Sequence, residues 1–210
     1  QYTPRTINSE INGLAVSKQN QIPYNWVTCA QAQTLANGMS TDSNKTSSLL
    51  FGIQWDLTCK FLQEKGGLSL FEIKSGDDVG SINWGNYTNS SIKLSRGRYN
   101  IKPWNSTSEW KSYNINTENY VSNLQTSENE KYLQLLTTGA SENTKKMNIY
   151  DLAGNEWEWT LEHVTSNTSK PCAVRGGCFN NYAFHDPAAM RHLYMTTNSG
   201  YFISFRSSLY

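Results

Sequence analysis

The sequence predicts an α+β fold, in which helices and strands occupy separate parts of the chain. Two stretches with helical character, residues 24–38 and 46–67, come first. Three stretches with strand character, residues 147–162, 172–177 and 201–210, come last. Because helices and strands do not alternate along the chain, a parallel β–α–β architecture is not expected.

The first predicted helix lies within residues 24–38, YNWVTCAQAQTLANG. Thr28 is a residue type that caps helix N-termini, and good helix formers follow it. Gly38 is a typical helix stop signal. The helix is therefore expected to begin after Thr28 and to end at Gly38.

The second predicted helix covers residues 46–67 and carries an apolar stripe that ends before Gly66 and Gly67. The members of this stripe recur at three- and four-residue spacing, as expected for one face of a helix. They are Leu50, Ile53, Leu57 and Phe61. We expect this helix and the preceding one to pack on the same face of a sheet.

The middle of the chain, residues 74–146, is poor in aliphatic side chains and rich in Ser, Asn, Gly, Trp and Tyr. It is predicted to form long irregular connections with short strands, pinned by aromatic anchors. The candidate anchors are Trp84, Trp104 and Trp110. Residues 1–20 are predicted to be an extended arm, which leaves residues 21–210 as a single domain.

Composition excludes two classes of partner. The net charge is +1, only 17% of the residues are charged, and Lys and Arg do not cluster. Nucleic acids and anionic membranes require a basic face, so neither is expected as a partner. No run of about 20 apolar residues is present, so we expect no membrane insertion. The first residue, Gln1, is not a Met, which is compatible with a signal or anchor ahead of it.

Four cysteines are present, Cys29, Cys59, Cys172 and Cys178, and none lies in a C-x-x-C zinc or redox spacing. Four cysteines allow three pairing schemes. A Cys29–Cys59 disulfide is favoured, because each residue lies in a predicted helix and adjacent helices would bring them together. The alternative is that the cysteines are buried free thiols.

Three motifs occur in order near the C-terminal end: MNIYDLAGNEWEWTLE (147–162), AVRGGCFNN (173–181) and FISFRSSLY (202–210). Together they resemble the formylglycine-generating-enzyme (sulfatase-modifying factor) family, a variant of the C-type lectin fold. The match covers residues 147–210, and GIQWDLTCKFL (52–62) is similar to the family's second-helix region. The resemblance implies a C-type lectin fold of the formylglycine-generating-enzyme subtype, with two helices packed on twisted antiparallel sheets and long irregular loops.

The same motifs also have a structural interpretation of their own. Trp157 and Trp159 are two residues apart, so a strand places them on the same face. Gly176–Gly177 allows another backbone segment to approach closely. Arg206 is expected to pair with a buried carboxylate, for which Glu158 is a candidate.

The family's catalytic residues are missing from this sequence. In the enzymes, two cysteines after the R-G-G motif bind copper and activate oxygen, and these positions correspond to Asn181 and Asp186 here. We therefore expect no copper and no enzymatic activity. The alternative is a formylglycine-generating or other metal- or thiol-dependent oxidoreductase that uses a displaced pair, Cys172 and Cys178, or histidines. The histidines, which show no metal-ligand spacing, are His163, His185 and His192.

A calcium ion is expected at the turn before Trp157. In the resembled family, this turn holds calcium through oxygen atoms, the ligands that a hard cation prefers. The resemblance transfers this role to the side chains of Asp151 and Glu158 and to the carbonyls of Gly154 and Glu156. The alternative is that Asp151 caps a turn and that Glu158 pairs with an arginine.

The C-terminal segment is also similar to that of the variable proteins of diversity-generating retroelements, which share this fold. In those proteins an error-prone reverse transcriptase rewrites codons between fixed residues. Residues 175–210 show a similar alternation, and the residues reachable from randomised codons are amphipathic, as in antibody loops. These residues, predicted to form a ligand-binding surface, are Phe179, Asn181, Tyr182, Phe184, His185, Asp186, His192, Leu193, Tyr194, Tyr201 and Phe202. The alternative is that Phe179, Phe184 and Tyr201 are buried in the core.

The sequence therefore predicts a non-catalytic, receptor- or adhesin-like binding protein with a diversified C-terminal surface. Its ligand is expected to be a protein or a glycan. The expected location is extracellular or surface-displayed, on a bacterial cell, a pilus-like structure or a phage particle.

Overall fold

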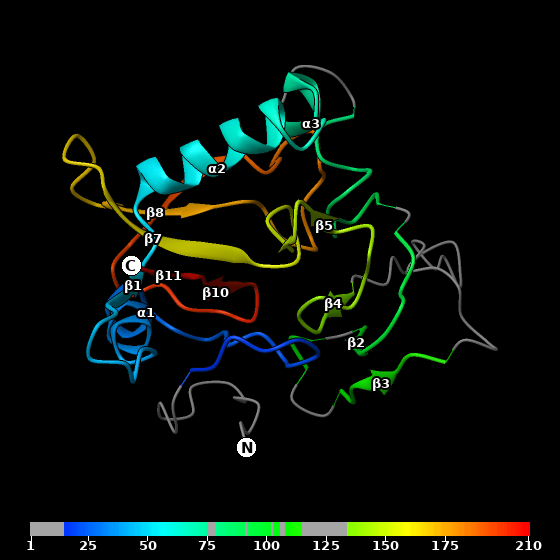
Figure 1. The fold of residues 1–210 in the computed structure, drawn as a ribbon, viewed down its shortest axis with the longest axis horizontal. Coiled ribbons are helices and arrows are strands. Elements are labelled where there is room, and N and C mark those ends of the chain that lie inside the picture. Colours follow the sequence, from blue (N-terminus) through cyan, green and yellow to red (C-terminus); the bar gives the residue numbers. More distant parts are fainter. Residues whose placement is uncertain (1–14, 75–78, 91, 102, 106–107, 115–133) are drawn as a thin grey trace.

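The computed structural model describes residues 15–74, 79–90, 92–101, 103–105, 108–114 and 134–210 (Figure 1). These residues form three helices and eleven short strands, so the predicted α+β class is confirmed. The helices are α1 (Cys29–Asn37), α2 (Gly52–Glu64) and α3 (Leu70–Ile73). The strands are β1 (Ser47–Leu49), β2 (Arg98–Asn100), β3 (Lys111–Ser112), β4 (Leu135–Leu136), β5 (Lys145–Lys146), β6 (Ile149–Tyr150), β7 (Trp157–His163), β8 (Cys172–Arg175), β9 (Arg191–Tyr194), β10 (Ile203–Phe205) and β11 (Ser207–Leu209).

The central sheet has four strands in the order β10-β7-β8-β9 (Figure 1). β7, β8 and β9 pair antiparallel, as expected for strands joined by simple turns. The expectation of purely antiparallel sheets is wrong for β10, which runs parallel to β7 with Ile203 opposite Trp157. The chain crosses from β9 to the far edge of the sheet before it enters β10, and this crossing reverses the expected direction.

The two longer helices lie on opposite faces of the central sheet, so the expectation of one shared face is wrong. Side chains alternate between the faces of a strand. On β8, Cys172 and Val174 belong to the apolar cluster that includes α1. Arg175 points the other way and pairs with Asp56 on α2. Because successive side chains of β8 point to opposite faces of the sheet, the strand contacts α1 on one face and α2 on the other.

Helix α1 has the boundaries that its sequence predicts. The Oγ1 atom of Thr28 accepts a hydrogen bond from the Gln31 N–H (3.3 Å), and the Gln31 side chain accepts one from the Thr28 N–H (3.0 Å). This reciprocal pair is a capping box, which satisfies two of the free N–H groups at a helix start. The helix ends at Gly38, whose N–H bonds back to the last turn.

Helix α2 begins later than predicted and buries a different face. The first residues of the predicted stretch form β1, which pairs with β11. The buried side chains of the helix are Trp55, Cys59 and Leu62, at helical spacing. Three of the four members of the predicted stripe are exposed instead: Ile53 (65%), Leu57 (61%) and Phe61 (42%). Two apolar stripes compete on this helix, and the one with Trp55 is buried because its indole N–H bonds to Ala188 O (2.9 Å).

The middle of the chain forms a small three-stranded sheet, β3-β2-β4, with its own apolar cluster. Of the predicted anchors, Trp84 is buried in the cluster that includes α2, whereas Trp104 is 39% exposed. Of the predicted arm, residues 1–14 lie outside the described residues. Lys18 and Asn20, in the described part, hydrogen-bond to Thr138. The middle region therefore packs beside the central sheet (Figure 1). The described residues of the arm hold the turn at Thr138.

In the described part of the chain, no helix is both long and apolar enough to cross a membrane.

Candidate functional site

The candidate site is built on the loop between β8 and β9. Its backbone is hydrogen-bonded to groups outside the loop at points along its whole length. These bonds are Phe179 N–H to Asn155 O (3.1 Å), Thr88 N–H to Asn181 O (2.9 Å), Ala183 N–H to Asn89 Oδ1 (3.0 Å), Ala188 N–H to Ser81 Oγ (2.9 Å) and Ala189 N–H to Ile73 O (3.0 Å). The position of the backbone therefore does not depend on the exposed side chains of the loop.

Two glycines turn the chain from β8 into this loop. Gly176 and Gly177 both have positive φ angles, 92° and 76°. A Cβ atom on Gly177 would lie 2.1 Å from the carbonyl oxygen of Asp186, so no larger residue fits there. The Gly176 carbonyl also accepts a hydrogen bond from the Tyr87 hydroxyl (2.7 Å). The predicted close backbone approach at this corner is confirmed.

The tip of the loop gathers three rings, which we call the first ring group: Tyr182, Phe184 and His185. The Tyr182 carbonyl accepts hydrogen bonds from the N–H groups of His185 and Asp186 (3.0 Å each), which form a tight turn. The ring centroids of Phe184 and His185 are 4.2 Å apart, and those of Tyr182 and Phe184 are 5.6 Å apart. Tyr182 is 39% exposed and His185 is also exposed, so the group presents ring surface to solvent.

A second ring group consists of His192 and Tyr194 on β9 together with Tyr201 and Phe202 before β10. Neighbouring centroids are 4.9 Å apart for His192 and Tyr194, 6.4 Å for Tyr194 and Phe202, and 5.1 Å for Tyr201 and Phe202. The inner sides of the β9 rings contact buried tryptophans. These contacts are Trp157 with His192 (5.7 Å) and Trp159 with Tyr194 (6.1 Å). The rings are therefore half-buried on a rigid base.

Asp186 interacts electrostatically with one histidine of each ring group. Its pKa is raised mainly by burial, and attraction to His192 and His185 opposes that rise. The carboxyl group is thus close to one histidine of each ring group. It provides hydrogen-bond acceptors in the centre of an otherwise aromatic surface.

Two tryptophans that sequence reasoning did not assign to the site also contact it. The Tyr201 ring lies 6.1 Å from Trp26 and 6.0 Å from Trp104, measured between centroids. The segment around Trp26 is fixed by two bonds, from Trp26 N–H to Gly200 O (3.0 Å) and from the Asn25 side chain to Tyr201 O (3.1 Å). Sequence spacing carries no signal for these contacts, because the partners come from distant parts of the chain.

Three residues of the predicted surface have other positions. Phe179 is buried, with 1% of its surface exposed, because the glycine corner directs it inward against Tyr201. The Asn181 side chain turns back and accepts a hydrogen bond from the Cys178 N–H (3.1 Å). Leu193 lies opposite Ala173 and, by strand alternation, on the α2 side of the sheet. The other predicted residues of the surface are at least partly exposed.

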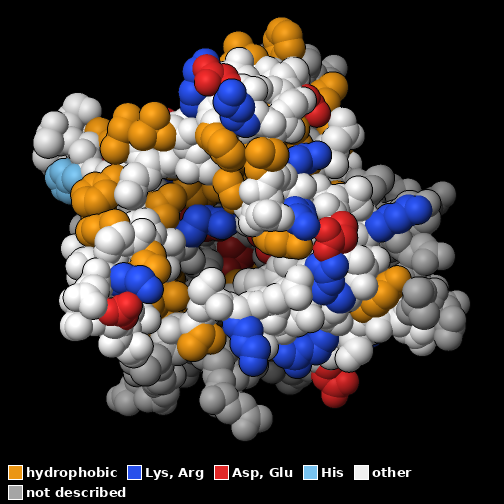
Figure 2. Space-filling view, in the orientation of Figure 1, with side chains coloured by type: hydrophobic (Ala, Val, Ile, Leu, Met, Phe, Trp, Pro, Cys, Tyr) orange, Lys and Arg blue, Asp and Glu red, His pale blue; other side chains and the backbone are white. Residues whose placement is uncertain are grey.

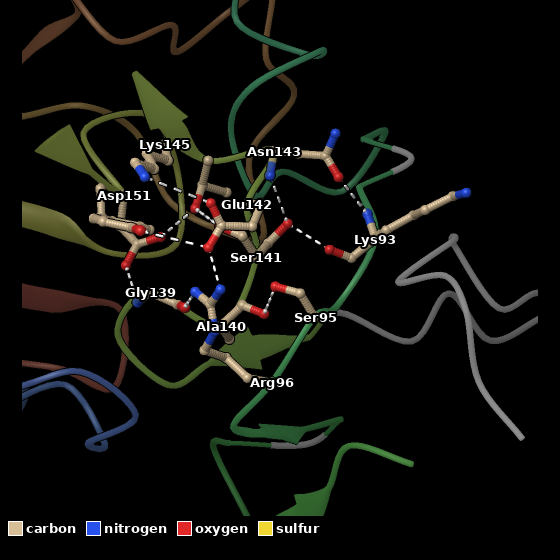
Figure 3. A network of polar contacts seen from close by, with 12 residues as sticks. Lys93, Ser95, Arg96, Gly139, Ala140, Ser141, Glu142, Asn143, Lys145 and Asp151 are labelled. Carbon is tan, nitrogen blue, oxygen red and sulfur yellow. Dashed lines mark hydrogen bonds and ion pairs between the residues drawn. The ribbon is translucent and has the colours of Figure 1, made fainter. Parts of the chain in front are cut away.

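The side chain of Asp151, a predicted calcium ligand, is already occupied by protein donors. Its two oxygens accept hydrogen bonds from the Thr144 hydroxyl (2.7 Å) and the Gly139 N–H (2.7 Å), and Figure 3 shows the carboxylate at the edge of the network around Glu142. Burial raises the pKa of Asp151, and these two donors oppose the rise. Asp151 therefore caps the turn that contains Gly139, which was the alternative interpretation.

Two further members of the predicted calcium set, the Glu158 carboxylate and the Gly154 carbonyl, also accept hydrogen bonds from the protein. Both carboxylate oxygens of Glu158 accept hydrogen bonds from Arg206 (2.7 Å each), whose guanidinium also bonds to the carbonyl of Asp151 (3.1 Å). The Gly154 carbonyl accepts from the Glu156 N–H (2.9 Å). Among the described residues, no group of three or more His, Cys, Asp or Glu side chains is arranged to hold a metal ion. The Arg206 guanidinium therefore neutralises the Glu158 carboxylate, and calcium binding at this turn stays a prediction from the resemblance.

A cavity of about 570 Å³ opens beside this ion pair. It corresponds to the hollow in Figure 2, where Lys or Arg and Asp or Glu side chains lie side by side. Its polar lining includes Lys18, Tyr150, Glu156, Glu158 and Arg206. Because acidic and basic groups are mixed there, the cavity favours neither an anionic nor a cationic ligand.

The described cysteines are all free, so the predicted Cys29–Cys59 disulfide is wrong. Cys29 lies on α1 and Cys59 on α2, and the central sheet separates these helices. The displaced pair proposed for an oxidoreductase lies in one apolar cluster, but its two thiols are free and have different neighbours. Cys172 faces Cys29, whereas the sulfur of Cys178 lies 2.7 Å from Asn180 Oδ1. No geometry in the described residues favours the oxidoreductase alternative.

No protein-family model and no curated protein matches this chain. The chain is similar to Treponema denticola variable protein 1. The two structures agree with a TM-score of 0.48 and 16% sequence identity, over 95% of this chain and 76% of that chain.

Proposed function

We propose that the chain is a non-catalytic ligand-binding protein with a C-type lectin fold, and that the two ring groups with Asp186 form its ligand surface. The observation that carries this proposal is that the backbone and the rings of the loop between β8 and β9 have different roles. Fixed groups outside the loop hold its backbone, whereas its rings face solvent. A preorganised surface of this kind loses little conformational entropy when it binds.

The chemistry of the surface favours a protein or a glycan as the ligand. Tyr, Trp and His provide large contact areas with few rotatable bonds, and their polar atoms supply directional hydrogen bonds. The ring groups contain no Lys or Arg, so the surface lacks the charges that contact phosphates.

We further propose that this surface is diversified, as in variable proteins of diversity-generating retroelements, and displayed outside the cell or on a phage particle. The support is that most of the codon-reachable residues, Tyr182, His185 and Tyr201 among them, are at least partly exposed; Phe179 is the buried exception. The test is the neighbouring DNA. An adenine-rich near-copy of codons 175–210 next to a reverse-transcriptase gene supports diversification, and its absence beside the complete gene contradicts it.

The binding proposal is tested with the intact chain on a glycan array and against a peptide display library. We expect that any ligand found is lost in Tyr182→Ala and Tyr201→Ala variants. Leu57→Ala and Phe71→Ala are matched controls, because they remove exposed apolar side chains (61% and 56% exposed) from α2 and α3. A ligand that survives both ring variants and is lost in a control variant contradicts the proposal.

A further inference from the structure

The thiols of Cys29 and Cys172 lie together between α1 and the central sheet. Cys29 is the first residue of α1, and its sulfur lies 3.8 Å from the Thr160 carbonyl oxygen on β7. The Thr160 hydroxyl in turn bonds to the carbonyl of Ala173 on β8 (3.1 Å), the residue that follows Cys172. Both cysteines pack in the same apolar cluster. Helix and strand thus bring the two sulfurs to one place from distant parts of the chain.

The raised pKa of the Cys29 thiol agrees with its position beside Cys172. Its pKa is raised to about 12, first by burial and then by the charge and hydrogen bonding of the neighbouring Cys172. The other two cysteines have different surroundings. Cys59 packs on the opposite side of the sheet, in the cluster that includes α2. Cys178 lies in the same cluster as Cys29 and Cys172, but its sulfur contacts Asn180 Oδ1 (2.7 Å) and Asn181 Oδ1 (2.9 Å).

We propose that Cys29 and Cys172 form a disulfide when the folded chain meets an oxidised low-molecular-weight disulfide such as glutathione disulfide. The Cys29 thiolate, which is the more exposed of the two, attacks one sulfur of the oxidant and releases one glutathione thiolate. The Cys172 thiolate then attacks the Cys29 sulfur of the mixed disulfide and releases the second glutathione. Two protein thiols are oxidised, one disulfide is reduced, and the two thiol protons go to the released glutathiones.

The cross-link would join α1 to β8 across a long stretch of sequence, since its two ends are far apart in the chain. A disulfide that closes a long loop restricts the unfolded chain and so stabilises the folded one. Cys172 also lies opposite Tyr194 in the β8–β9 pairing, so the cross-linked strand supports the second ring group. This inference does not depend on the proposed binding function.

The test uses the purified full chain, reduced and then equilibrated with glutathione disulfide at pH 8.5. Free thiols are counted with dithionitrobenzoate after denaturation, and the linked peptides are identified by mass spectrometry. We expect the four thiols present in the sequence to fall to two, with a Cys29–Cys172 peptide. The melting temperature should rise by about 5 °C or more and should return to its initial value after reduction. Because the thiolate is the reacting form, oxidation should be roughly tenfold faster per pH unit between pH 7 and 9.

Three variants make the result specific. Cys59→Ser should still lose two thiols on oxidation. Cys172→Ser should lose only one, held as the mixed disulfide of Cys29 with glutathione, and Cys29→Ser should lose none. Retention of all four thiols in the folded wild-type chain, or a cross-link between other cysteines, would overturn the proposal. A cross-link that forms only after denaturation would also overturn it, because the pairing is inferred from the folded state.

Discussion

The glycine corner and the ring groups belong to the same C-terminal segment but differ in what their side chains contact. Arg175, just before the corner, is fully buried and forms ion pairs with Asp56 and Glu162. Tyr182, at the loop tip, is 39% exposed and contacts rings of its own loop. The comparison indicates that the corner determines the backbone path and that the tip determines what the surface presents. It follows that substitutions should affect folding in the first region and binding in the second.

The largest expected effect is at the glycine corner. Gly177→Ala should lower the free energy of unfolding by about 3 kcal/mol or more, because strain at positive φ adds to a clash with the Asp186 carbonyl. Gly67→Ala is the matched control. Gly67 has a similar φ of 72°, but a Cβ there meets no atom within 4 Å, so the cost should be only about 1–2 kcal/mol. Urea unfolding of both variants checks this prediction, and equal losses would show that close approach is unimportant.

A slightly smaller effect is expected for the buried ring of the loop. Phe179→Ala should cost about 3 kcal/mol, since it removes a ring that is only 1% exposed and leaves a cavity. Thermal unfolding provides the measurement. A loss of unfolding free energy below about 1 kcal/mol would indicate that Phe179 belongs to the ligand surface and not to the core.

A third expected effect depends on pH and concerns a buried carboxyl group of the scaffold. Burial raises the pKa of Glu156 well above its usual 4.5, although hydrogen bonds from Asn25 and Ser204 oppose the rise. The folded state therefore retains this proton more strongly than the unfolded state. The associated stability is fully present below about pH 4.5 and decreases as the pH rises toward the folded-state pKa. Glu156→Gln should remove this decrease and flatten the dependence of unfolding free energy on pH.

The control for this pH effect is Glu142→Gln. The pKa of Glu142 is lowered, first by the hydrogen bond from Arg96, so its contribution has the opposite sign and is lost as the pH falls. Unfolding measured from pH 4 to pH 8 separates the two variants. If the unfolding free energies of the wild type and of Glu156→Gln depend on pH in the same way, Glu156 is not buried and protonated in the folded state.

The smallest expected effect on stability is at the loop tip. Tyr182→Ala and His185→Ala should each change the free energy of unfolding by less than about 0.5 kcal/mol, because both side chains are exposed. Differential scanning calorimetry is sensitive enough to check this. A loss comparable to that of Phe179→Ala would make the loop tip part of the core.

Local signals in the sequence predict some elements well. Thr28 and Gly38 define the ends of α1 because capping involves only neighbouring residues. Gly176 and Gly177 indicate the corner for the same reason, since their conformations exclude other residues. The pairing of Arg206 with Glu158 was also a candidate from the sequence, and the structure confirms it.

Features that depend on tertiary packing were not predictable in this way. α2 carries two apolar stripes, and only the packing of Trp55 under Ala188 selects the buried one. The parallel pairing of β10 and the contact of Trp26 with Tyr201 join distant segments that no spacing relates. Within the predicted surface, Phe179 and Tyr182 are both aromatic. Only the path of the loop backbone determines that Phe179 is buried and Tyr182 is exposed.

If the ring groups form a replaceable surface, their residues can be exchanged while the fold is retained. This expectation is tested most directly by randomising Tyr182, Phe184, His185, His192 and Tyr201 together in a displayed library and measuring the fraction of protease-resistant clones. A second library, randomised at five buried positions, gives the reference for loss of fold: Trp157, Trp159, Arg175, Gly176 and Gly177. We expect most clones of the first library and almost none of the second to resist protease. Equal sensitivity of the two libraries would contradict this expectation.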